Sequence, residues 1–531
     1  MSVPMTQKSS ESRAQVCVSL CATSIDQLKN EIDRTKSYAD LIELRLDCLP
    51  DSELIYAVGS GLLRTISSPV ILTLRSTEQG GHCCWSQSKR LEFWLKHFAP
   101  NSHNTHLSDI ELDLAVLLLK SQRPETAAID WSRVICSYHD FEGSPANLEA
   151  IYERMAALPA RVLKIAVRAH QITDTVPVFK LLERARREGR ELIAIAMGEA
   201  GLVTRILGPA RGALLTFGAS DPSRATAPGQ ITCKELTRTY RLRCISLSTQ
   251  IMGVVGAPVT QSISPQIHNA AFEALGIDAV YLPFEVTNLE EFIRRMIRPS
   301  TRELDWRLRG LSITAPHKTR ILEVLDWVDD AAREIGSVNT IVVHDNLLCG
   351  YNTDAQAAVA PLRGMNLRGA HVAVIGTGGA ARALLWSLRK EKAVVTVFSR
   401  SLPGATSLAE EFGAHAQPLP KASFDGFELV INAMPLGMRG PLIDETPATA
   451  DQLRGAKTAY DLVYHPADTR FLGEARAAGC QIIGGLAMFL AQAAEQFRLW
   501  TGREAPLQVM TQAAALALKD RHLAFTATSS K

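Results

Sequence analysis

The sequence predicts an α/β protein in two parts, an N-terminal (β/α)8 barrel and a C-terminal part built from two α/β lobes. Eight short, β-branched apolar runs alternate with helix-like stretches over the first half of the chain. A second series of strands begins after a polar, basic stretch at Thr232–Arg243, and a glycine-rich loop interrupts that series at Gly376. These three observations place a domain boundary near residue 245.

The length and composition are those of a globular protein with several domains. The 531 residues are enough for two to four domains of roughly 100–200 residues each. The 57 basic and 55 acidic side chains leave a formal charge of +2, so we expect neither a nucleic-acid nor a membrane partner. No window approaches about 20 consecutive apolar residues, and Met1 to Ala14 lacks the apolar core of a secretory signal. We therefore expect a cytoplasmic protein, with its oligomeric state left open.

The ten cysteines are too sparse for a disulfide scaffold. Cys17 and Cys21 lie on an apolar run, where buried thiols are common. The adjacent Cys83 and Cys84 have neither a second CxxC nor a histidine pair to complete a zinc set. We expect structural or inert cysteines, a reducing compartment and no metal.

The expected barrel covers residues 15–240. Its helices include the amphipathic stretches Asn147–Leu158 and Thr173–Arg187, and its least regular part lies between Leu112 and Val134. The eight expected strands are Val16–Ala22, Leu41–Asp47, Val70–Arg75, Leu107–Leu112, Val134–His139, Val162–Val167, Leu192–Met197 and Ala213–Phe217.

Polar residues inside these strands indicate an active site. Glu43 and Arg45 alternate along the second strand and therefore share one face. Arg75 ends the third strand, His139 ends the fifth, and Lys164 lies in the middle of the sixth. A charge within such a run is costly unless it is paired or catalytic, and barrel enzymes keep their active sites at the carboxyl ends of the strands.

Lys164 is the centre of this prediction. It lies between Leu163 and Ile165, and desolvation by such neighbours lowers the pKa of an ammonium group. A neutral amine can attack a carbonyl carbon to form a Schiff base. The alternative is a lysine that reaches solvent from a strand end, but the nearby His139 and the arginines favour catalysis.

Four motifs in this half follow the order and spacing of one known family. They are Glu43-Leu44-Arg45-Leu46-Asp47, Ser137-Tyr138-His139-Asp140-Phe141, Val162-Leu163-Lys164-Ile165-Ala166 and Ala227-Pro228-Gly229-Gln230. Over about residues 15–235 the sequence resembles type I 3-dehydroquinate dehydratase. The resemblance implies that Lys164 forms an imine with the C3 ketone of 3-dehydroquinate, and that His139 removes the C2 proton and later protonates the departing C1 hydroxyl. It also implies that the substrate is held by Glu43, Arg45, Arg75, Arg205, Thr226 and Gln230.

One position departs from that family. Its members usually have a glutamate directly before the paired glycines of the loop after the third strand, whereas here Gln79 precedes Gly80-Gly81 and Glu78 lies one residue earlier. If the acid sets the protonation of the histidine, this protein is slower or uses Glu78 instead.

The glycine-rich loop of the second half is typical of a dinucleotide site. An expected strand, Val372–Ile375, leads into Gly376, Gly378, Gly379 and Ala380, and an expected helix follows. The next strand ends in Ser399, Arg400 and Ser401 rather than in an acid. An acid there would bind the ribose of NAD, whereas an arginine between two hydroxyls suits the 2′-phosphate of NADP. A solvated surface arginine is the alternative.

Further motifs surround this loop in a known order. They are Ser262-Ile263-Ser264-Pro265-Gln266-Ile267-His268-Asn269, Ser312-Ile313-Thr314-Ala315-Pro316-His317-Lys318, Gly336-Ser337-Val338-Asn339-Thr340, Gly350-Tyr351-Asn352-Thr353-Asp354, Asn432-Ala433-Met434-Pro435 and Met488-Phe489-Leu490-Ala491-Gln492. Over residues 250–525 the sequence resembles shikimate dehydrogenase. The resemblance implies a substrate lobe at 250–360 and 485–525, and a Rossmann NADP-binding lobe at 365–484.

The same resemblance implies the roles of single residues. Ser262 and Ser264 bind the substrate carboxylate, and Lys318 and Asp354 flank the carbon that is oxidised or reduced. Ketone reduction needs a hydride and a proton, and an ammonium group held by a carboxylate supplies the proton and stabilises the negative charge on oxygen. The ring hydroxyls are assigned to Thr314, Asn339 and Gln492, and the cofactor also to Met434 and Gly485.

The whole chain therefore resembles a fused type I 3-dehydroquinate dehydratase and shikimate dehydrogenase. That resemblance implies dehydration of 3-dehydroquinate to 3-dehydroshikimate and reduction by NADPH to shikimate, a sequence used in aromatic amino-acid biosynthesis. Two alternatives are a catabolic quinate or shikimate dehydrogenase fusion and a non-catalytic sensor of pathway metabolites. Ser264 favours shikimate, since the carboxylate then keeps two hydroxyl donors, and the presence of Lys164, His139, Lys318 and Asp354 disfavours the sensor.

Overall fold

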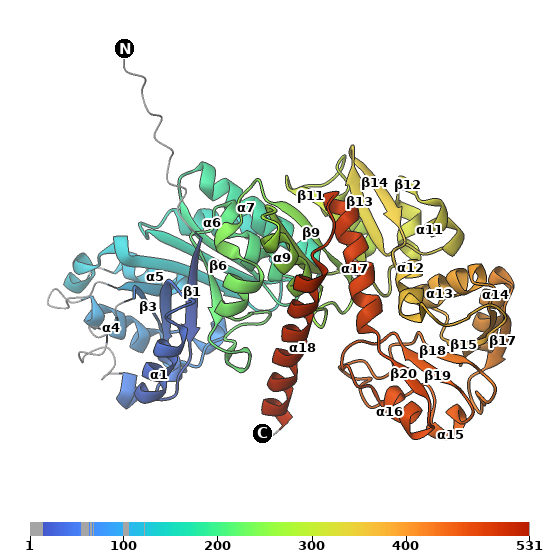
Figure 1. Ribbon diagram of the computed structural model, residues 1–531. Coiled ribbons are helices and arrows are strands. Elements are labelled where there is room, and N and C mark those ends of the chain that lie inside the picture. The colour runs from blue at the N-terminus through green and yellow to red at the C-terminus, as the bar shows by residue number, and fades with distance from the viewer. Residues whose placement is uncertain are drawn as a thin grey trace, which may run out of the picture. The chain divides into compact units, whose positions relative to one another are not determined.

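A computed structural model describes residues 14–54, 63, 66, 68–98, 106–121 and 123–529 (Figure 1). The chain forms two compact units, and the change from the first to the second lies between Thr249 and Gln250. The three residues Glu303–Asp305 lie within the sequence of the second unit but belong to the first. The candidate signal region before Ala14 lies outside the described residues. None of the described helices is both long and apolar enough to cross a membrane.

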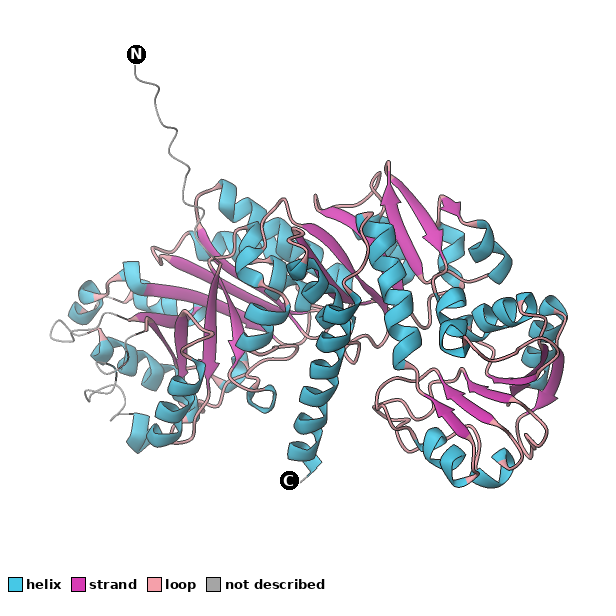
Figure 2. Cartoon of the chain, in the orientation of Figure 1, coloured by secondary structure: helices cyan, strands magenta, loops and turns pink. Residues whose placement is uncertain are grey.

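The first unit is an eight-stranded parallel barrel, which confirms the predicted fold class (Figure 2). Each strand pairs with its sequence neighbours, and β1 also pairs with β8. An isolated parallel bridge between Leu192 and Ala213 joins β7 to the segment before β8 and nearly closes the barrel. The strands are β1 (Gln15–Leu20), β2 (Leu41–Arg45), β3 (Val70–Thr73), β4 (Leu107–Glu111), β5 (Val134–Asp140), β6 (Val162–Arg168), β7 (Glu191–Met197) and β8 (Leu215–Ala219).

Helices follow most of these strands and cover the outside of the barrel. Those described are α1 (Ile25–Thr35), α4 (Gln87–His97), α5 (Leu112–Lys120), α6 (Leu148–Ala156), α7 (Thr175–Arg187) and α8 (Leu202–Leu207). The segment after β4, the least regular in the sequence, forms the nine-residue helix α5 and then short 3₁₀ turns. Inside the barrel, buried apolar side chains such as Cys17, Ile71 and Ile193 fill the interior. The candidate polar residues follow them towards the carboxyl ends of the strands.

The second unit contains a mixed sheet with the order β10-β9-β11-β13-β14-β12. Its strands are β9 (Gln250–Gly256), β10 (Ala279–Glu285), β11 (Arg307–Ile313), β12 (Trp327–Val328), β13 (Thr340–His344) and β14 (Leu347–Tyr351). Its helices are α9 (Ser264–Ala274), α10 (Leu289–Phe292), α11 (Asp330–Ile335) and α12 (Asp354–Val359). The C-terminal helices α17 (Leu486–Thr501) and α18 (Leu507–Ser529) return to this lobe, where Phe497, Trp500 and Met510 share a core with Phe272 and Tyr281.

The other lobe of this unit has a wholly parallel sheet with the order β17-β16-β15-β18-β19-β20. Counted along the chain this order is 3-2-1-4-5-6, which is the Rossmann topology. Its strands are β15 (His371–Ile375), β16 (Val394–Ser399), β17 (His415–Pro418), β18 (Leu429–Asn432), β19 (Thr458–Asp461) and β20 (Gln481–Ile483). Its helices are α13 (Gly379–Lys390), α14 (Leu402–Phe412), α15 (Ala450–Leu453) and α16 (Arg470–Ala477).

One cysteine differs from the expectation. Cys17 is a buried thiol on β1, as expected, but Cys21 forms a disulfide with Cys48. The apolar run ends with the strand at Leu20, so Cys21 lies in the turn beyond it and is only half-buried. The expectation of a buried thiol is therefore wrong for Cys21, while a disulfide agrees with the structural role that was also expected.

Candidate active sites

All eight residues assigned to the dehydratase site lie around one cavity at the carboxyl ends of the barrel strands. These residues come from six strands or the loops that follow them, and the parallel arrangement brings them to the same end of the barrel. Those residues are Glu43, Arg45, Arg75, His139, Lys164, Arg205, Thr226 and Gln230. Gln79, Gly80 and Phe141 complete part of the wall.

Lys164 is buried, with 6% of its surface exposed, but its surroundings differ from those expected. Its Nζ donates to Asp109 Oδ2 at 2.8 Å and to Glu43 Oε1 at 3.0 Å, and it lies 4.2 Å from the centre of the Phe217 ring. Leu163 and Ile165 point away, because side chains alternate along a strand. The expectation of an ammonium group enclosed by aliphatic neighbours is therefore wrong about its charge environment, although it is right about burial.

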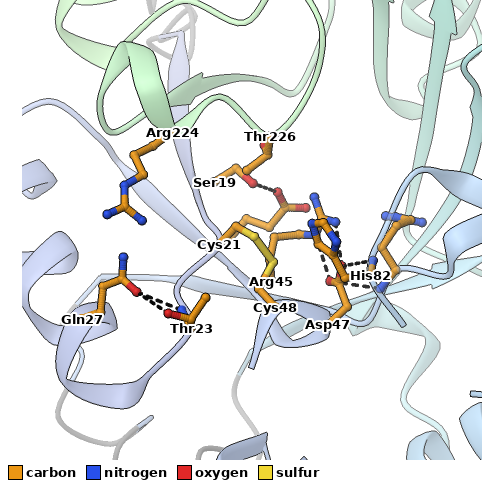
Figure 3. The surroundings of a disulfide bond; sticks show 12 residues. Ser19, Cys21, Thr23, Gln27, Arg45, Asp47, Cys48, His82, Arg224 and Thr226 are labelled. Carbon is orange, nitrogen blue, oxygen red and sulfur yellow. Dashed lines mark hydrogen bonds and ion pairs between the residues drawn. A yellow bond between two sulfur atoms is a disulfide. The ribbon is translucent and has the colours of Figure 1, made fainter. Parts of the chain in front are cut away.

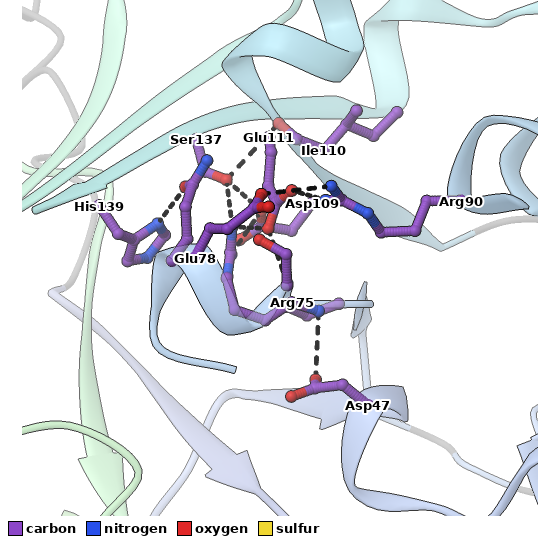
Figure 4. Close-up of polar contacts among 12 residues, drawn as sticks. Asp47, Arg75, Glu78, Arg90, Asp109, Ile110, Glu111, Ser137 and His139 are labelled. Atoms are coloured by element: carbon purple, nitrogen blue, oxygen red, sulfur yellow. Dashed lines mark hydrogen bonds and ion pairs between the residues drawn. The ribbon is translucent and has the colours of Figure 1, made fainter. Parts of the chain in front are cut away.

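Asp109 joins Lys164 to Arg75, and Figure 4 shows the contact with the arginine. Its other oxygen, Oδ1, accepts from Arg75 at 2.7 Å and from the Ser137 hydroxyl at 2.5 Å, and Arg75 also donates to Ser137 at 2.7 Å. Burial raises the pKa of Asp109, but the charges of Arg75, Lys164 and His139 outweigh it and leave that pKa far below its usual value. A permanent anion therefore lies between two cations that line the cavity.

A second carboxylate orders the cavity wall formed by β2. Glu43 accepts from the Ser19 hydroxyl at 2.5 Å and from Thr73 at 2.9 Å in addition to Lys164. Its pKa is lowered because Lys164 and Arg45 together outweigh the desolvation. Both carboxylates are thus ionised and can stabilise a positive charge on the nitrogen of Lys164.

Asp47 holds the arginine at the end of β2. Its two oxygens accept from Arg45 Nε at 2.9 Å and from Arg45 Nη2 at 2.7 Å. The same carboxylate accepts from the backbone amides of Arg75 at 3.2 Å and His82 at 2.9 Å, so it also joins the loops after β2 and β3 (Figures 3 and 4). The Arg45 side chain is therefore fixed at the cavity edge before any substrate binds.

Arg205 is a buried cation that no carboxylate neutralises among the described residues. Only 2% of its surface is exposed, and its guanidinium donates only to the carbonyl oxygens of Phe217 and Pro228, both at 3.4 Å, while Nε has no partner. Desolvation lowers the pKa of Arg205 to about 10. Thr226 and Gln230, which bond to each other at 3.1 Å, lie on the same cavity. An anionic ligand group would supply the missing partner.

The surroundings of His139 favour the neutral imidazole, which can act as a base. Burial, followed by the charges of Arg75 and Lys164, lowers its pKa well below 6.5, so the imidazole is neutral at pH 7. Gln79 Oε1 lies 3.4 Å from His139 Nδ1, in the position where the resemblance places an acid. Glu78 is exposed and pairs with Arg90 at 3.7 Å, so it does not take over that position.

In the second unit, Lys318 and Asp354 form a close ion pair. Lys318 Nζ lies 2.5 Å from Asp354 Oδ2, and Asn339 Nδ2 donates to Asp354 Oδ1 at 2.8 Å. Lys318 follows β11, whereas Asp354 begins α12, so the pair joins two elements of the substrate lobe. Asn339 also exchanges hydrogen bonds with Thr353, which accepts at 2.9 Å and whose amide donates at 2.8 Å.

The remaining predicted substrate residues lie in the same lobe. The Ser262 hydroxyl donates to Ser264 Oγ at 3.0 Å at the start of α9. Thr314 follows β11 directly, and its amide donates to Val255 in β9 at 2.9 Å. Gln492 lies on α17. Its backbone carbonyl oxygen accepts from the hydroxyl of Thr353, the residue before Asp354, at 3.2 Å. The residues named for substrate binding therefore come from β9–α9, β11, β13, α12 and α17 of one lobe.

The glycine loop fits a dinucleotide. Gly376 has a φ of +125°, which favours glycine, and the N-cap of α13 is Gly378, which has no side chain to bond the free amides of the first turn. A Cβ on Gly379 would lie 2.8 Å from Ser337 Oγ and 3.1 Å from Lys318 Cβ, so this backbone lies directly against Lys318. Unoccupied amides at a helix N-terminus bind the pyrophosphate of such cofactors.

The other residues assigned to the cofactor lie around this loop. Ser399 ends β16 and accepts from the amide of Ser401 at 3.2 Å, and the exposed Arg400 lies between them. The side chain of Met434 lies 3.2 Å from the position of a Cβ on Gly376. Gly485 precedes α17, and Ala380 belongs to the first turn of α13. Ser399, Arg400 and Ser401, at the end of β16, are suited to the 2′-phosphate of NADP.

Sequence reasoning missed the carboxylates on β4. Asp109 and Glu111 alternate within the apolar run Leu107–Leu112, which is the same signal that identified Glu43 and Arg45. Glu111 accepts from the Ser76 amide at 2.8 Å and pairs with Arg90. Applied to this run, the same rule would have predicted Asp109 as a member of the site.

Two sites of different chemistry in one chain define a class of protein, a Schiff-base lyase joined to a nicotinamide-dependent dehydrogenase. Type I 3-dehydroquinase matches residues 16–246, and the shikimate dehydrogenase substrate binding domain matches residues 254–341. A family of F420-dependent NADP oxidoreductases matches residues 371–455, and the shikimate 5′-dehydrogenase C-terminal domain matches residues 485–515. The chain belongs to the family of bifunctional 3-dehydroquinate dehydratase/shikimate dehydrogenases.

Individual relatives span nearly the whole chain. The chloroplastic bifunctional 3-dehydroquinate dehydratase/shikimate dehydrogenase of Arabidopsis thaliana is 32% identical, covering 94% of this chain and 83% of its own. The shikimate biosynthesis protein AroDE of Chlamydia pneumoniae is 30% identical, covering 91% of this chain and 95% of its own. A solved shikimate 5-dehydrogenase of Thermus thermophilus, in complex with NADP(H) and shikimate, is 38% identical over 51% of this chain and 100% of its own, with a TM-score of 0.45. This chain thus has two activities of the shikimate pathway, those of 3-dehydroquinate dehydratase and of NADP-dependent shikimate dehydrogenase.

Proposed function

We propose that Lys164 is the imine-forming residue of the dehydratase and that His139 is its acid–base partner. The observation that carries this proposal is the position of both side chains on one cavity, with Lys164 between two ionised carboxylates. Lys164 passes one ammonium proton to His139, and the resulting amine attacks the C3 ketone. His139 returns that proton to the departing oxygen, which leaves as water, so a positively charged iminium remains and His139 is neutral again. Asp109 and Glu43 stabilise that charge in the ionised form they already have.

His139 then moves the protons. As a neutral imidazole it takes the C2 proton, and the electron pair left at C2 passes into the iminium. The C1 hydroxyl leaves as water with the proton that His139 received. Hydrolysis of the iminium consumes one water molecule, releases 3-dehydroshikimate and returns Lys164 to its ammonium form, so atoms and charges balance.

The arginines position the substrate. Arg205 is the proposed partner of the substrate carboxylate, because it is buried without an anion of its own. Arg75 and Arg45 are already paired with Asp109 and Asp47, so they act mainly by fixing those carboxylates and the cavity wall. Glu43, Thr226 and Gln230 are proposed to bind the hydroxyl groups of the substrate ring.

In the dehydrogenase, we propose Lys318 as the proton donor and Asp354 as the group that holds it. NADPH, when bound, supplies the hydride. The 2.5 Å contact with Asp354 keeps the ammonium form of Lys318 in place, and Asn339 orients that carboxylate. Ser262 and Ser264 are proposed to bind the shikimate carboxylate, with Thr314 and Gln492 at its ring hydroxyls.

We propose that the cofactor amides are those of Gly376, Gly378, Gly379 and Ala380, and that Arg400 with Ser399 and Ser401 selects NADP. Met434 and Gly485 are proposed to border the same site. The partners of the chain are then small molecules, with no nucleic acid or membrane among them, and we propose a cytoplasmic location from the sequence expectation.

We propose functional domains at 15–240 and at 250–525, with the dinucleotide lobe at 365–484. Each part contains its own core and all residues assigned to its own site. Halves separated near residue 245 should therefore each keep one activity. Loss of both activities in halves that remain folded would contradict this division.

Trapping of the imine tests the proposed role of Lys164. Borohydride added to the protein with 3-dehydroquinate should leave a reduced adduct on the peptide that contains Lys164, and Lys164→Ala should show none. Lys180→Ala, which removes a lysine from the exposed surface of α7, is the matched control and should be labelled like the wild type. An adduct on another lysine would overturn the assignment. The dehydrogenase activity of each variant reports whether the second unit has folded, and its circular dichroism spectrum reports whether the barrel has.

A further inference from the structure

Three side chains at the open end of the barrel form a cluster that neither activity uses. Cys21 lies one residue after β1, Cys48 ends the 3₁₀ turn Leu46–Cys48 that follows β2, and His82 lies in the loop after β3. The two sulfur atoms form a disulfide although the cysteines are 27 residues apart in sequence (Figure 3). One ligand atom of each of the three residues lies within 4.8 Å of the others.

We propose that the reduced form of Cys21 and Cys48, together with His82, binds zinc or a cation of similar softness, and that the disulfide form does not. A tetrahedral zinc ion has sulfur ligands at about 2.3 Å and nitrogen ligands at about 2.0–2.1 Å, which separates neighbouring ligand atoms by roughly 3.4–3.8 Å. The three ligand atoms are already within 4.8 Å of one another. After reduction, a moderate separation of the two sulfurs would be enough to admit the ion.

The backbone around the cluster is held in place by Asp47. Its carboxylate accepts from the amide of His82 at 2.9 Å and from the amide of Arg75 at 3.2 Å, so the loop that carries His82 is tied to the residue before Cys48. Both carboxylate oxygens are also occupied by Arg45. Asp47 therefore fixes the positions of the ligands and does not itself become a fourth ligand.

The fourth coordination position would face solvent. His82 is exposed, and Cys21 and Cys48 are only half-buried, so a water molecule can reach the ion. Two thiolates and one imidazole favour zinc over magnesium or calcium, which prefer oxygen ligands. Their two negative charges also balance the charge of the ion close to the guanidinium of Arg45.

The redox step is a two-electron exchange with a dithiol. A protein or small-molecule dithiol would reduce the Cys21–Cys48 bond and become a disulfide itself, which leaves two thiols on this chain. Binding of the ion then displaces one proton from each thiol. In a reducing compartment a persistent disulfide is uncommon, so the dithiol, metal-binding form would be populated there.

Cobalt(II) titration tests the site in the full chain. Protein reduced with a phosphine, freed of reductant without air and titrated with Co²⁺ should bind one ion per chain with a thiolate-to-cobalt absorption band that Zn²⁺ abolishes. The same wild-type protein in its disulfide form should show no such band. Cys21→Ser and Cys48→Ser should each remove the band, and His82→Ala should weaken binding by about tenfold or more.

Cys84→Ser is the matched control, because Cys84 is an exposed free thiol two residues from His82. That variant should bind cobalt as the wild type does. The proposal is overturned if the reduced protein binds no cobalt, if the disulfide form binds it equally well, or if Cys84→Ser rather than Cys21→Ser removes the band. The readout is metal binding, so the result does not depend on the residue roles proposed for either activity.

Discussion

Lys164 Nζ lies 2.8 Å from Asp109 Oδ2, and the other oxygen of the same carboxylate binds Arg75 at 2.7 Å. The imine nitrogen would therefore carry its positive charge next to an anion that a second cation already holds in place. Asp109→Asn keeps the shape of the side chain and removes the charge. We expect it to lower the dehydratase kcat by about 100- to 1,000-fold, since removing one fixed charge partner of the developing iminium costs roughly 2.7–4 kcal/mol.

The dehydrogenase activity of Asp109→Asn should remain at the wild-type level, which shows that the second unit is folded. Asp113→Asn, on the exposed side of α5, is the matched control and should leave both activities unchanged. A wild-type kcat in Asp109→Asn would show that the contact with Lys164 has no part in catalysis.

No carboxylate among the described residues pairs with Arg205, so replacing it should weaken substrate binding without lowering the stability of the barrel. In Arg205→Gln the substrate carboxylate loses a charged donor, so the dehydratase kcat/KM should fall by roughly 10- to 100-fold, as expected for hydrogen bonds to charged groups of about 1.5–3 kcal/mol. The free energy of unfolding should not decrease, because the change removes a buried cation that has no anion.

Steady-state kinetics and the urea midpoint for loss of dehydratase activity measure both effects. Arg205→Lys keeps the charge but cannot donate two parallel hydrogen bonds. Its dehydratase kcat/KM should therefore lie between those of the wild type and of the glutamine variant. A marked loss of stability in Arg205→Gln, with an unchanged KM for 3-dehydroquinate, would assign Arg205 a structural role instead.

The barrel could be predicted from the sequence because its signal is local. Short apolar runs at regular spacing predict strands, and all eight expected strands overlap the observed ones. Their ends are less predictable, since pairing with neighbours decides them. The eighth strand was expected at Ala213–Phe217 but lies at Leu215–Ala219, because Ala213 forms only an isolated bridge whereas Ala219 pairs with Ser19 in β1.

The contacts that give the site its chemistry could not be predicted in the same way. Lys164 on β6 contacts Glu43 on β2 and Asp109 on β4, and only closure of the barrel brings these alternate strands together. Local sequence shows that Lys164 is buried but not which charges surround it. The disulfide of Cys21 and Cys48 depends in the same way on the parallel pairing of β1 with β2.

The exposed Arg400 predicts the basis of cofactor choice. Arg400→Ala should raise the KM for NADPH by about tenfold and leave the KM for NADH nearly unchanged, because only NADPH carries the 2′-phosphate that the guanidinium would bind. Initial rates of 3-dehydroshikimate reduction with each of the two cofactors measure this. Arg389→Ala, at the exposed far end of α13, should change neither constant. An equal rise in the KM values for NADPH and NADH would contradict a role for Arg400 in cofactor selectivity.

His268 predicts how the stability of the second unit depends on pH. It is fully buried against Tyr281, with ring centroids 4.4 Å apart, and neither ring nitrogen has a hydrogen-bond partner among the residues that the structure describes. Desolvation lowers the pKa of His268 to about 3. Below pH 6.5 the unfolded chain takes up a proton that the folded chain does not. This protonation stabilises the unfolded state, so the free energy of unfolding falls as the pH decreases.

This loss should approach about 1.4 kcal/mol per pH unit below pH 6.5. In His268→Phe the ring remains but cannot take up a proton, so the fall in the urea midpoint for loss of dehydrogenase activity between pH 7 and pH 5 should become smaller. His344→Gln changes a histidine on the exposed surface and is the matched control, which should show the pH dependence of the wild type. An unchanged pH dependence in His268→Phe would show that the buried imidazole is not the group responsible.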